Sequence, residues 1–410
     1  MTDLLPRFVA AGRRRPVDLV APGSTLAEVV APYVAATGPG PLELTSGSDR
    51  LVARYDGSAA WLEVTAGGRT TRHRSRRHAR TDGPVREVGL VLTGTSLTVL
   101  TRGPGPWTAR TRVDLAGRVD TRSAQWLAGL RTDAPHAGRF GQLGLRDLRL
   151  VTGAPDGRVL LSATSAGPGF FQTAHTSLWE LDPATLSLTH CSDLFFRRAD
   201  RPGAYGDHAT HVLRDGDAWL VATSTWGDFD RRRPAVGVTL ARTSADLLSG
   251  AHLLDTQPLA LPLDGLRSVG TWDPHLVRTE DGWLVGFVSA TRYFRFHPAL
   301  AGGPSLDALR LLGAASDLTQ AEGTTLAHLG GQWRVLASDE RAQRYPVFDL
   351  AMHETGTVDA PYPSNIPWPT LVPDGDGWLL VGFDGRRQGG ELAGYGTHGD
   401  VVFARSVTEG

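Results

Sequence analysis

Pairs of short apolar runs separated by a glycine-containing turn recur along the second part of the chain. In the clearest copy, residues 270–279 are followed by a turn at Asp281-Gly282 and by a second run at 283–287. An Asp-Gly pair between two such runs is a strong local signal for a β-hairpin. The pattern therefore predicts antiparallel hairpins, and the other four copies begin at residues 146, 208, 322 and 368.

Five copies of one hairpin predict a repeat architecture. A repeat of roughly 40–50 residues that carries several strands is typical of a β-propeller blade. We therefore expect a five-bladed β-propeller over residues 136–410, with the longer early repeats explained by insertions on one rim. In four copies a tryptophan opens the second strand, and we expect it to pack between blades: Trp219, Trp283, Trp333 and Trp378.

Residues 1–135 lack the repeat and show shorter alternating segments. Examples are 42–45, 51–55, 60–64 and 88–92, in which apolar and polar residues alternate between Gly, Ser and Asp turns. Period-two strands of this kind predict an antiparallel β-sandwich, followed by a helical stretch over 121–131. The expected fold class is all-β, with an N-terminal sandwich domain over 1–135 and a propeller over 136–410.

Composition narrows the classes of function. A length of 410 residues suggests two domains, and the net charge of −1 does not favour nucleic acid or anionic membranes as partners. The single cysteine, Cys191, excludes an internal disulfide and a cysteine-based zinc site. Neither a secretory leader nor an apolar run of about 18 residues is present, so we expect a cytoplasmic protein. One Asn and one Ile, with no Lys, indicate a GC-rich bacterial source.

The residues that open the hairpins are the candidates for chemistry, because the innermost strands of a propeller begin at its central channel. They are Asp147, the segment 207–211, Asp273, Glu322 and Trp368. A buried carboxylate costs several kcal/mol unless it is paired or used. Three carboxylates at corresponding places could hold blades together through backbone amides, but they suit a catalytic site better.

Three short motifs resemble those of the five-bladed β-propeller glycoside hydrolases, above all family 43. Arg146-Asp147-Leu148 is similar to the Arg-Asp-Pro of that family, Asp273-Pro274 matches its Asp-Pro, and Glu322-Gly323 matches the start of its Glu-Gly-Pro. The resemblance covers about residues 140–405. It implies an inverting hydrolase of arabinofuranosyl or xylosyl oligosaccharides, of the arabinanase, arabinofuranosidase and xylosidase type, acting in carbohydrate metabolism.

The same resemblance implies roles for the three carboxyl residues. Asp147 would be the base that activates water, Glu322 the acid that protonates the leaving oxygen, and Asp273 the residue that orients the acid and raises its pKa. Inversion needs two such groups on opposite sides of the bond. Candidate substrate contacts are stacking by Trp272 and Trp368 and hydroxyl contacts by Arg146, His208, His211 and His275.

The sequence departs from the family in several places. The predicted sandwich precedes the propeller, whereas in many family 43 members it follows. The motifs of the fructan-cleaving families 32 and 68 are absent. The last blade lacks a histidine near the channel floor, which His208, His211 or His398 could replace.

Two further questions are whether the chain binds a metal ion and whether it has a non-catalytic role. Asp207, His208 and His211 could hold a divalent ion such as calcium, but calcium prefers oxygen ligands, so we expect no essential cofactor. The alternative to an enzyme is a carbohydrate- or protein-binding propeller, in which the carboxylates join blades and the insertions at 166–176, 226–235 and 291–309 bind a partner. The sugar, the linkage, endo or exo action and the oligomeric state stay open.

Overall fold

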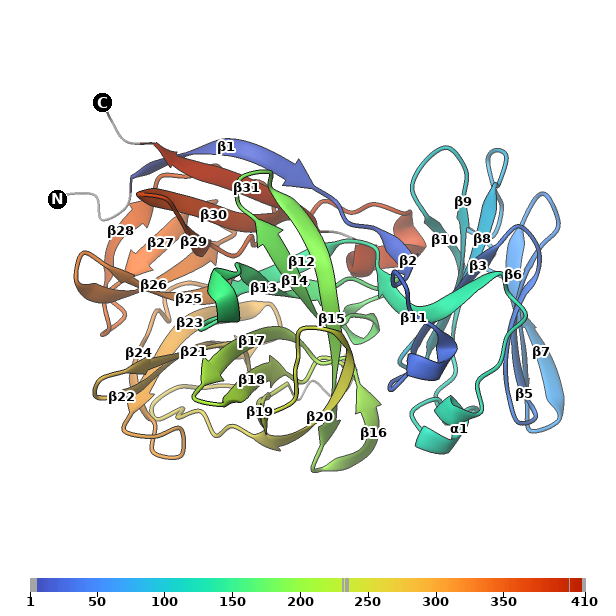
Figure 1. Ribbon diagram of the computed structural model, residues 1–410, viewed down its shortest axis with the longest axis horizontal. Coiled ribbons are helices and arrows are strands. Elements are labelled where there is room, and N and C mark those ends of the chain that lie inside the picture. Colours follow the sequence, from blue (N-terminus) through green and yellow to red (C-terminus); the bar gives the residue numbers. More distant parts are fainter. Residues whose placement is uncertain (1–5, 231, 233–235, 398, 408–410) are drawn as a thin grey trace.

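The computed structural model describes residues 6–230, 232, 236–397 and 399–407, and it is an all-β structure (Figure 1). The described helices are short. They are the α-helix α1 (Ala124–Ala128) and the 3-10 helices η1 (Leu26–Glu28), η2 (Pro155–Gly157), η3 (Phe171–Thr173) and η4 (Glu391–Thr397). None of them has the length and hydropathy that a membrane span requires.

Most strands after residue 145 belong to antiparallel units of four. Two units stand alone as sheets, β21 (Gly270–Thr279) to β24 (Arg310–Ala314) and β25 (Ala321–Leu329) to β28 (Glu354–Val358), and two more join into one nine-stranded sheet through the parallel pair β15–β20. The intervening strands are β22 (Gly282–Arg292), β23 (Arg295–Gly303), β26 (Gln332–Asp339) and β27 (Tyr345–Phe348). The nine-stranded sheet contains β12 (Leu145–Leu150), β13 (Leu160–Ser165), β14 (His175–Asp182), β15 (Ser187–Arg198), β16 (Arg201–Tyr205), β17 (His208–Asp215), β18 (Ala218–Ser224), β19 (Val238–Thr243) and β20 (Gly250–Pro258).

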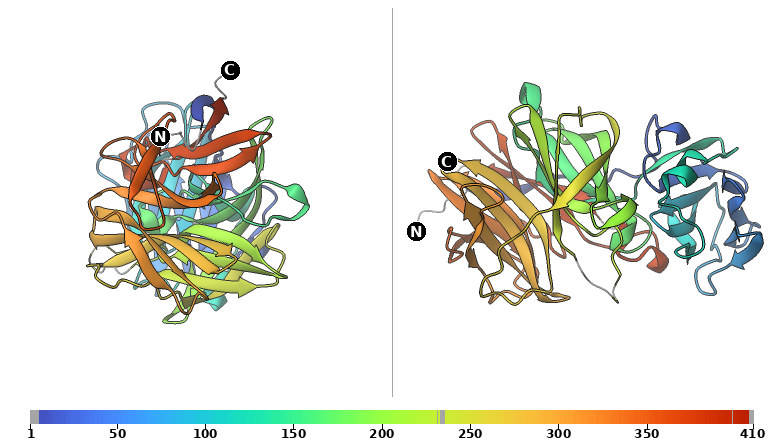
Figure 2. Two further views of the ribbon diagram at one scale, coloured as in Figure 1. Left: turned by 90° about the vertical axis from the view of Figure 1, so that its left-hand side faces the viewer. Right: turned by 90° about the horizontal axis from the view of Figure 1, so that it is seen from below.

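All five hairpins expected from the repeat are antiparallel strand pairs in the structure. They are β12–β13, β17–β18, β21–β22, β25–β26 and β29 (Thr370–Asp374) with β30 (Gly377–Asp384). Neighbouring first strands touch, since β12 contacts β17 and β29, β17 contacts β21, and β21 contacts β25. These units lie around a common centre (Figure 2). The side chains that open the first strands are thereby brought together.

The N-terminal part forms two sheets that share one hydrophobic core. The first contains β4 (Leu42–Ser46), β5 (Asp49–Tyr55), β6 (Ala60–Ala66) and β7 (Arg69–His73). The second runs in the order β10 (Thr108–Asp114), β9 (Ser96–Arg102), β8 (Glu87–Thr93), β3 (Tyr33–Gly38), β11 (His136–Gln142) and β2 (Asp18–Val20). Alternate apolar residues of both sheets, with Leu44, Leu62, Leu90 and Val99 among them, are buried against one another.

The predicted boundary between residues 135 and 136 is wrong for two strands. The strand β1 (Arg7–Arg14) pairs with β31 (Asp400–Val407) and completes the sheet of β29 and β30, so the two ends of the chain share one sheet (Figure 1). The strand β11 pairs with β3 and β2 and belongs to the N-terminal sheets. A strand can pair with a sheet that is distant in sequence, because an unpaired sheet edge leaves its amides and carbonyls unsatisfied.

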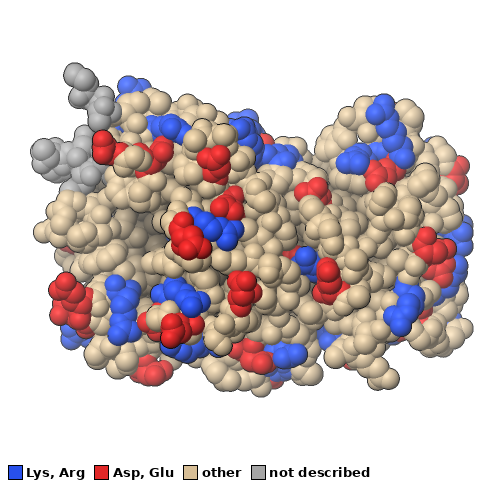
Figure 3. Space-filling model, in the orientation of Figure 1, with Lys and Arg blue, Asp and Glu red and all other residues tan. Residues whose placement is uncertain are grey.

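Acidic and basic side chains alternate over the face shown in Figure 3, in keeping with the net charge of −1. The arginine-rich stretch 69–80 includes the strand β7, which lies at the edge of its sheet, as expected for a solvated edge strand.

Candidate active site

The same backbone irregularity opens four of the hairpins. The strand register shifts between Arg146 and Arg149, His208 and His211, Trp272 and His275, and Glu322 and Thr325. The second residue of each shift has a left-handed backbone, with φ of 52° at Asp147, 58° at Ala209, 57° at Asp273 and 74° at Gly323. A left-handed aspartate is strained, and such strain is tolerated mainly at functional sites.

This register corrects the alignment made from the sequence. Glu322 is the first residue of its irregular segment, whereas Asp147 and Asp273 are second, so the three carboxyl groups do not occupy the same position. The second position of the β25 hairpin is Gly323, where an added Cβ would lie 2.4 Å from the ring of Trp368. The glycine therefore serves close packing beneath the site, and the carboxyl group comes from the residue before it.

A cavity of about 500 Å³ lies above these four segments. Asp147, Asp273 and Glu322 all line it, and so do Arg146, His208 and Trp272. The structure thus brings together six of the nine residues that the sequence singled out. The other three, His211, His275 and Trp368, lie outside the cavity lining.

Asp147 is held in a polar environment although it is buried. Its Oδ2 lies 3.6 Å from Nε of Arg146, and its carboxyl group is hydrogen-bonded to the hydroxyl of Thr164. The Thr164 hydroxyl also accepts a hydrogen bond from the Ala209 amide at 3.1 Å, which leaves its proton for Asp147. Burial raises the pKa of Asp147, while Arg146 and Thr164 oppose that rise by favouring the charged form.

Glu322 holds a proton at neutral pH. Burial, followed by the negative charge of Asp147, raises its pKa to about 8, and the indole Nε1 of Trp272 donates a hydrogen bond to Oε2 at 3.3 Å. The pKa of Asp273 is also raised well above its usual range, first by burial and then by the charge of Glu322. The sequence analysis ascribed the raised pKa of Glu322 to Asp273, whereas in the structure the charge of Asp147 is the main contribution after burial.

Arg149, which the sequence analysis did not single out, fills the space beneath the carboxyl groups. It is completely buried, its Nη1 donates to the carbonyl of Thr324 at 3.0 Å, and its guanidinium lies 4.6 Å from the centre of the Trp368 ring. Burial lowers the pKa of Arg149 to about 10, opposed by the charges of Asp273 and Asp147. The signal that could have revealed it was a second arginine on the short strand β12, which also carries Arg146 and Asp147.

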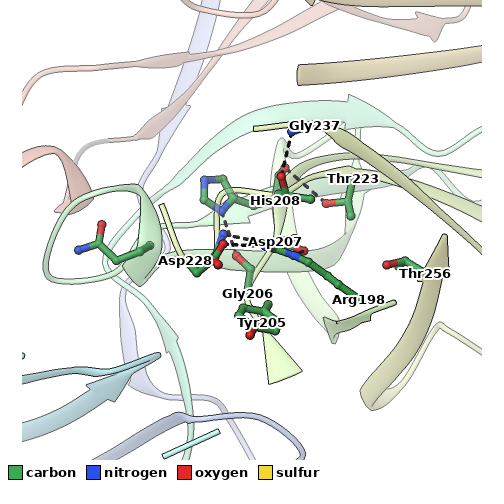
Figure 4. Close-up of polar contacts among 12 residues, drawn as sticks. Arg198, Tyr205, Gly206, Asp207, His208, Thr223, Asp228, Gly237 and Thr256 are labelled. Atoms are coloured by element: carbon green, nitrogen blue, oxygen red, sulfur yellow. Dashed lines mark hydrogen bonds and ion pairs between the residues drawn. The ribbon is translucent and has the colours of Figure 1, made fainter. Parts of the chain in front are cut away.

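His208 lines the cavity, and its neighbour Asp207 fixes the adjoining loop (Figure 4). Nδ1 of His208 lies 3.1 Å from the carbonyl of Gly206, so this nitrogen carries the proton, and burial lowers the pKa of the ring well below its usual range. Asp207 is fully buried, is bound by the guanidinium of Arg198, and accepts a hydrogen bond from the Gly227 amide at 2.9 Å.

His211 and His275 join neighbouring four-stranded units instead of lining the cavity. Nδ1 of His211 accepts the amide of Leu276 at 3.1 Å, and Nδ1 of His275 accepts the amide of Leu326 at 2.9 Å. Burial lowers the pKa of both rings well below the usual range, so both are neutral acceptors. The prediction that they contact substrate is therefore wrong, because their acceptor atoms are used by the first strand of the next unit.

Trp368 is 1% exposed and packs against Arg149 and Gly323. The prediction of an exposed ring at the channel mouth, stacking on a sugar, is wrong for this residue. The register of the last unit explains the error, since β29 begins only at Thr370 and no irregular segment turns the Trp368 side chain toward the cavity.

One wall of the cavity is aromatic. Phe170, Phe171, Trp226, Tyr293 and Phe294 line it together with Phe296 and Tyr395, and neighbouring rings are in contact. Most come from the insertions at 166–176, 226–235 and 291–309, of which residues 231 and 233–235 lie outside the described part. Phe294 is 54% exposed and stands at the rim. Flat apolar walls of this kind suit the faces of sugar rings.

The described residues contain no group of three or more His, Cys, Asp or Glu placed to hold a metal ion. The trio suggested from the sequence is engaged otherwise, since Asp207 binds Arg198 and His208 and His211 bind backbone groups. His398 lies outside the described residues. The expectation that no cofactor is essential stays a prediction.

Comparison with known proteins gives weak structural likeness only. No protein-family model and no curated sequence matches the chain. Among solved structures, the GH43_1 enzyme of Xanthomonas citri with xylotriose is 11% identical, with a TM-score of 0.45 over 65% of this chain and 88% of that one. The RS223 β-xylosidase is 11% identical, with a TM-score of 0.44 over 64% and 92%. The GH62 α-L-arabinofuranosidase catalytic domain of Coprinopsis cinerea is 11% identical, with a TM-score of 0.43 over 64% and 91%. At this level of similarity we draw no functional conclusion from these proteins.

Proposed function

We propose that this chain is a glycoside hydrolase whose active site is the cavity above the four irregular segments. The observation that carries the proposal is the pair Asp147 and Glu322, two carboxyl groups of one cavity with different environments. Asp147 has Arg146 and Thr164 beside it, which favour its charged form, whereas Glu322 has a pKa raised to about 8. Acid–base hydrolysis needs two carboxyl groups at once, one protonated and one charged, and different environments provide this.

In the proposed reaction, Glu322 donates its proton to the departing glycosidic oxygen. Asp147, as the charged base, removes a proton from a water molecule that attacks the anomeric carbon from the opposite face. The glycosidic C–O bond breaks as the new C–O bond forms, and Asp147 ends protonated. Burial and the charge of Asp147 keep the acid protonated, and Asp273 would orient it. Burial of these groups supports the assignment, because weak solvation strengthens each charge interaction.

We further propose an inverting mechanism on furanosides or pentosides, with the five four-stranded units acting as five propeller blades and the N-terminal sheets as a sandwich. This finer assignment rests on the motifs around Asp147, Asp273 and Glu322. His208 and Trp272 would contact substrate hydroxyls and ring faces. The test is NMR of the first anomer formed. Inversion is expected, and retained configuration would make Asp147 a nucleophile instead.

A binding protein without catalysis is the second candidate, and the aromatic wall favours it as much as it favours an enzyme. The different environments of Asp147 and Glu322 argue for catalysis, since binding alone does not need carboxyl groups with separate protonation states. Substitution of Asp147 by Asn separates the two. An enzyme would lose turnover and keep sugar binding, whereas a binding protein would show no turnover before or after.

A further inference from the structure

The cavity lining also contains two arginines with no other evident role. Arg386 and Arg387 lie in the loop between β30 and η4, line the cavity and are exposed. Among the described residues, the only ion pair of Arg386 places Nε 3.8 Å from Oδ1 of Asp384, and the Arg386 side chain is 74% exposed. Within that same part of the chain, Arg387 has no hydrogen bond, ion pair or ring contact.

Asp384 does not neutralise these two arginines, because its carboxylate is already engaged. Its Oδ2 accepts from Nη2 of Arg13 on β1 at 2.5 Å, and its Oδ1 accepts from the hydroxyl of Ser364 and from the Arg386 amide. The loop is therefore fastened at its base, while the two guanidinium groups stay available at the cavity rim. Gly385 lets the loop approach the segment beside it, since an added Cβ would lie 2.5 Å from Asn365.

The charges of the cavity are consequently divided between floor and rim. At the floor the guanidinium of Arg146 lies against Asp147, and Asp273, Glu322 and Glu340 are further carboxyl residues of the lining. Arg386 and Arg387 supply positive charge away from the floor, in a form that binds carboxylate or sulfate oxygens through paired N–H donors. A ligand with a neutral sugar at the floor and an anionic group at the rim would match both ends.

We propose that the natural substrate is an acidic oligosaccharide, in which a neutral sugar is cleaved and a neighbouring unit carries a carboxylate or sulfate that Arg386 and Arg387 bind. This inference rests on the proposed glycosidase function for the identity of the cleaved bond. The selectivity for an anion rests only on the two arginines and the loop that holds them.

The test is calorimetric titration of the full chain with two disaccharides that join a neutral to an acidic unit, glucuronosyl-xylose and a singly sulfated galactobiose, and with the glucuronosyl-xylose methyl ester and unsulfated galactobiose as neutral controls. We expect an anion to bind about tenfold or more tightly than its neutral counterpart at low salt, and the advantage to shrink in 0.5 M NaCl because exposed charges are screened. The double substitution Arg386→Gln with Arg387→Gln should abolish the preference. The control Arg278→Gln changes an arginine that is also exposed but lies outside the cavity, and it should leave the preference intact.

The arms of this experiment separate the possible outcomes. Preference for glucuronosyl-xylose alone identifies a uronic acid, and preference for the sulfated disaccharide alone identifies a sulfated sugar. Equal binding of charged and neutral ligands, absence of binding by both anions, or an unchanged preference in the double variant would overturn the inference. Hydrolysis of neutral aryl glycosides would then still support the proposed function. Anion binding without any hydrolysis would instead contradict the proposed function and leave the anion site standing.

Discussion

Replacing Glu322 with Gln removes the group that we assign as the proton donor while keeping its size. With a pKa of about 8, Glu322 is protonated and competent below that pH and loses its proton above it. Asp147 must be charged, and its pKa is raised above 3.8, so activity should fall again on the acidic side. The wild-type kcat/KM should therefore be bell-shaped, with a basic limb near pH 8 that is absent from the residual activity of Glu322→Gln.

The same pKa predicts how Glu322 affects stability. Burial raises the folded-state pKa above the unfolded value, so the folded protein binds the proton more tightly and loses stability as pH rises from about 4.5 to about 8. At about 1.4 kcal/mol per pKa unit this amounts to roughly 5 kcal/mol at most, and water in the cavity reduces it, so we expect about 2–5 kcal/mol. The amide introduced by Glu322→Gln does not ionise in this range, so the variant should escape this penalty.

The measurement is the melting temperature of both proteins from pH 5 to pH 9, together with their pH–rate profiles. Wild type and Glu322→Gln should melt alike at pH 5, and the variant should be more stable by several degrees at pH 9. A difference that does not change with pH, or a basic limb that persists in the variant, would refute the assignment of the raised pKa to Glu322.

Three further predictions follow from the site. Glu322→Gln should lose most activity on oligosaccharides and keep a sizeable part on a dinitrophenyl glycoside, whose leaving group needs no proton. Asp147→Asn should lose about 10²–10⁴-fold on both substrates. Steady-state kcat/KM is the measurement, and the reverse pattern would mean that the two residues have each other's role. Thr164→Val should move the acid limb of the pH–rate profile to higher pH, because Asp147 loses a hydrogen bond that favours its charged form. Thr164→Ser keeps the hydroxyl and should leave the limb at its wild-type position. If Thr164→Val does not move the limb, Thr164 does not tune the pKa of Asp147. His275→Phe should lower the free energy of unfolding by about 1–3 kcal/mol, because the Leu326 amide loses its acceptor, and should change kcat/KM little. Denaturant unfolding measures the stability, and a large loss of activity at unchanged stability would mean that His275 contacts substrate after all.

The hairpins were predictable because their signal is local. An Asp-Gly or Gly-Gly turn between apolar runs specifies an antiparallel pair without knowledge of the rest of the chain, and all five pairs are present. The pairing of β1 with β31 was not predictable in this way. It joins residues at the two ends of the chain, and the sequence of neither strand indicates which strand it pairs with.

The carboxyl groups were found because a charge at the start of an apolar strand is visible in the sequence, but their exact alignment was not. A register shift of one residue decides which way a side chain faces. Glu322 faces the cavity, whereas His275 faces the contact with the next four-stranded unit. The buried Trp368 shows the same limit, since its position depends on Gly323 and Arg149 of other units. Contacts of this kind arise only when the units are assembled.

The claim that this cavity hydrolyses glycosides is tested most directly by one comparison. The wild type and Asp147→Asn are assayed for dinitrophenol release from the dinitrophenyl glycosides of arabinofuranose, xylose, galactose and fructose. We predict that the wild type hydrolyses at least one of them, with a furanoside or pentoside preferred, and that the variant is slower by about 10²–10⁴-fold while it melts at a similar temperature. No release by the folded wild type on any of the four, or equal rates for the two proteins, would contradict the account.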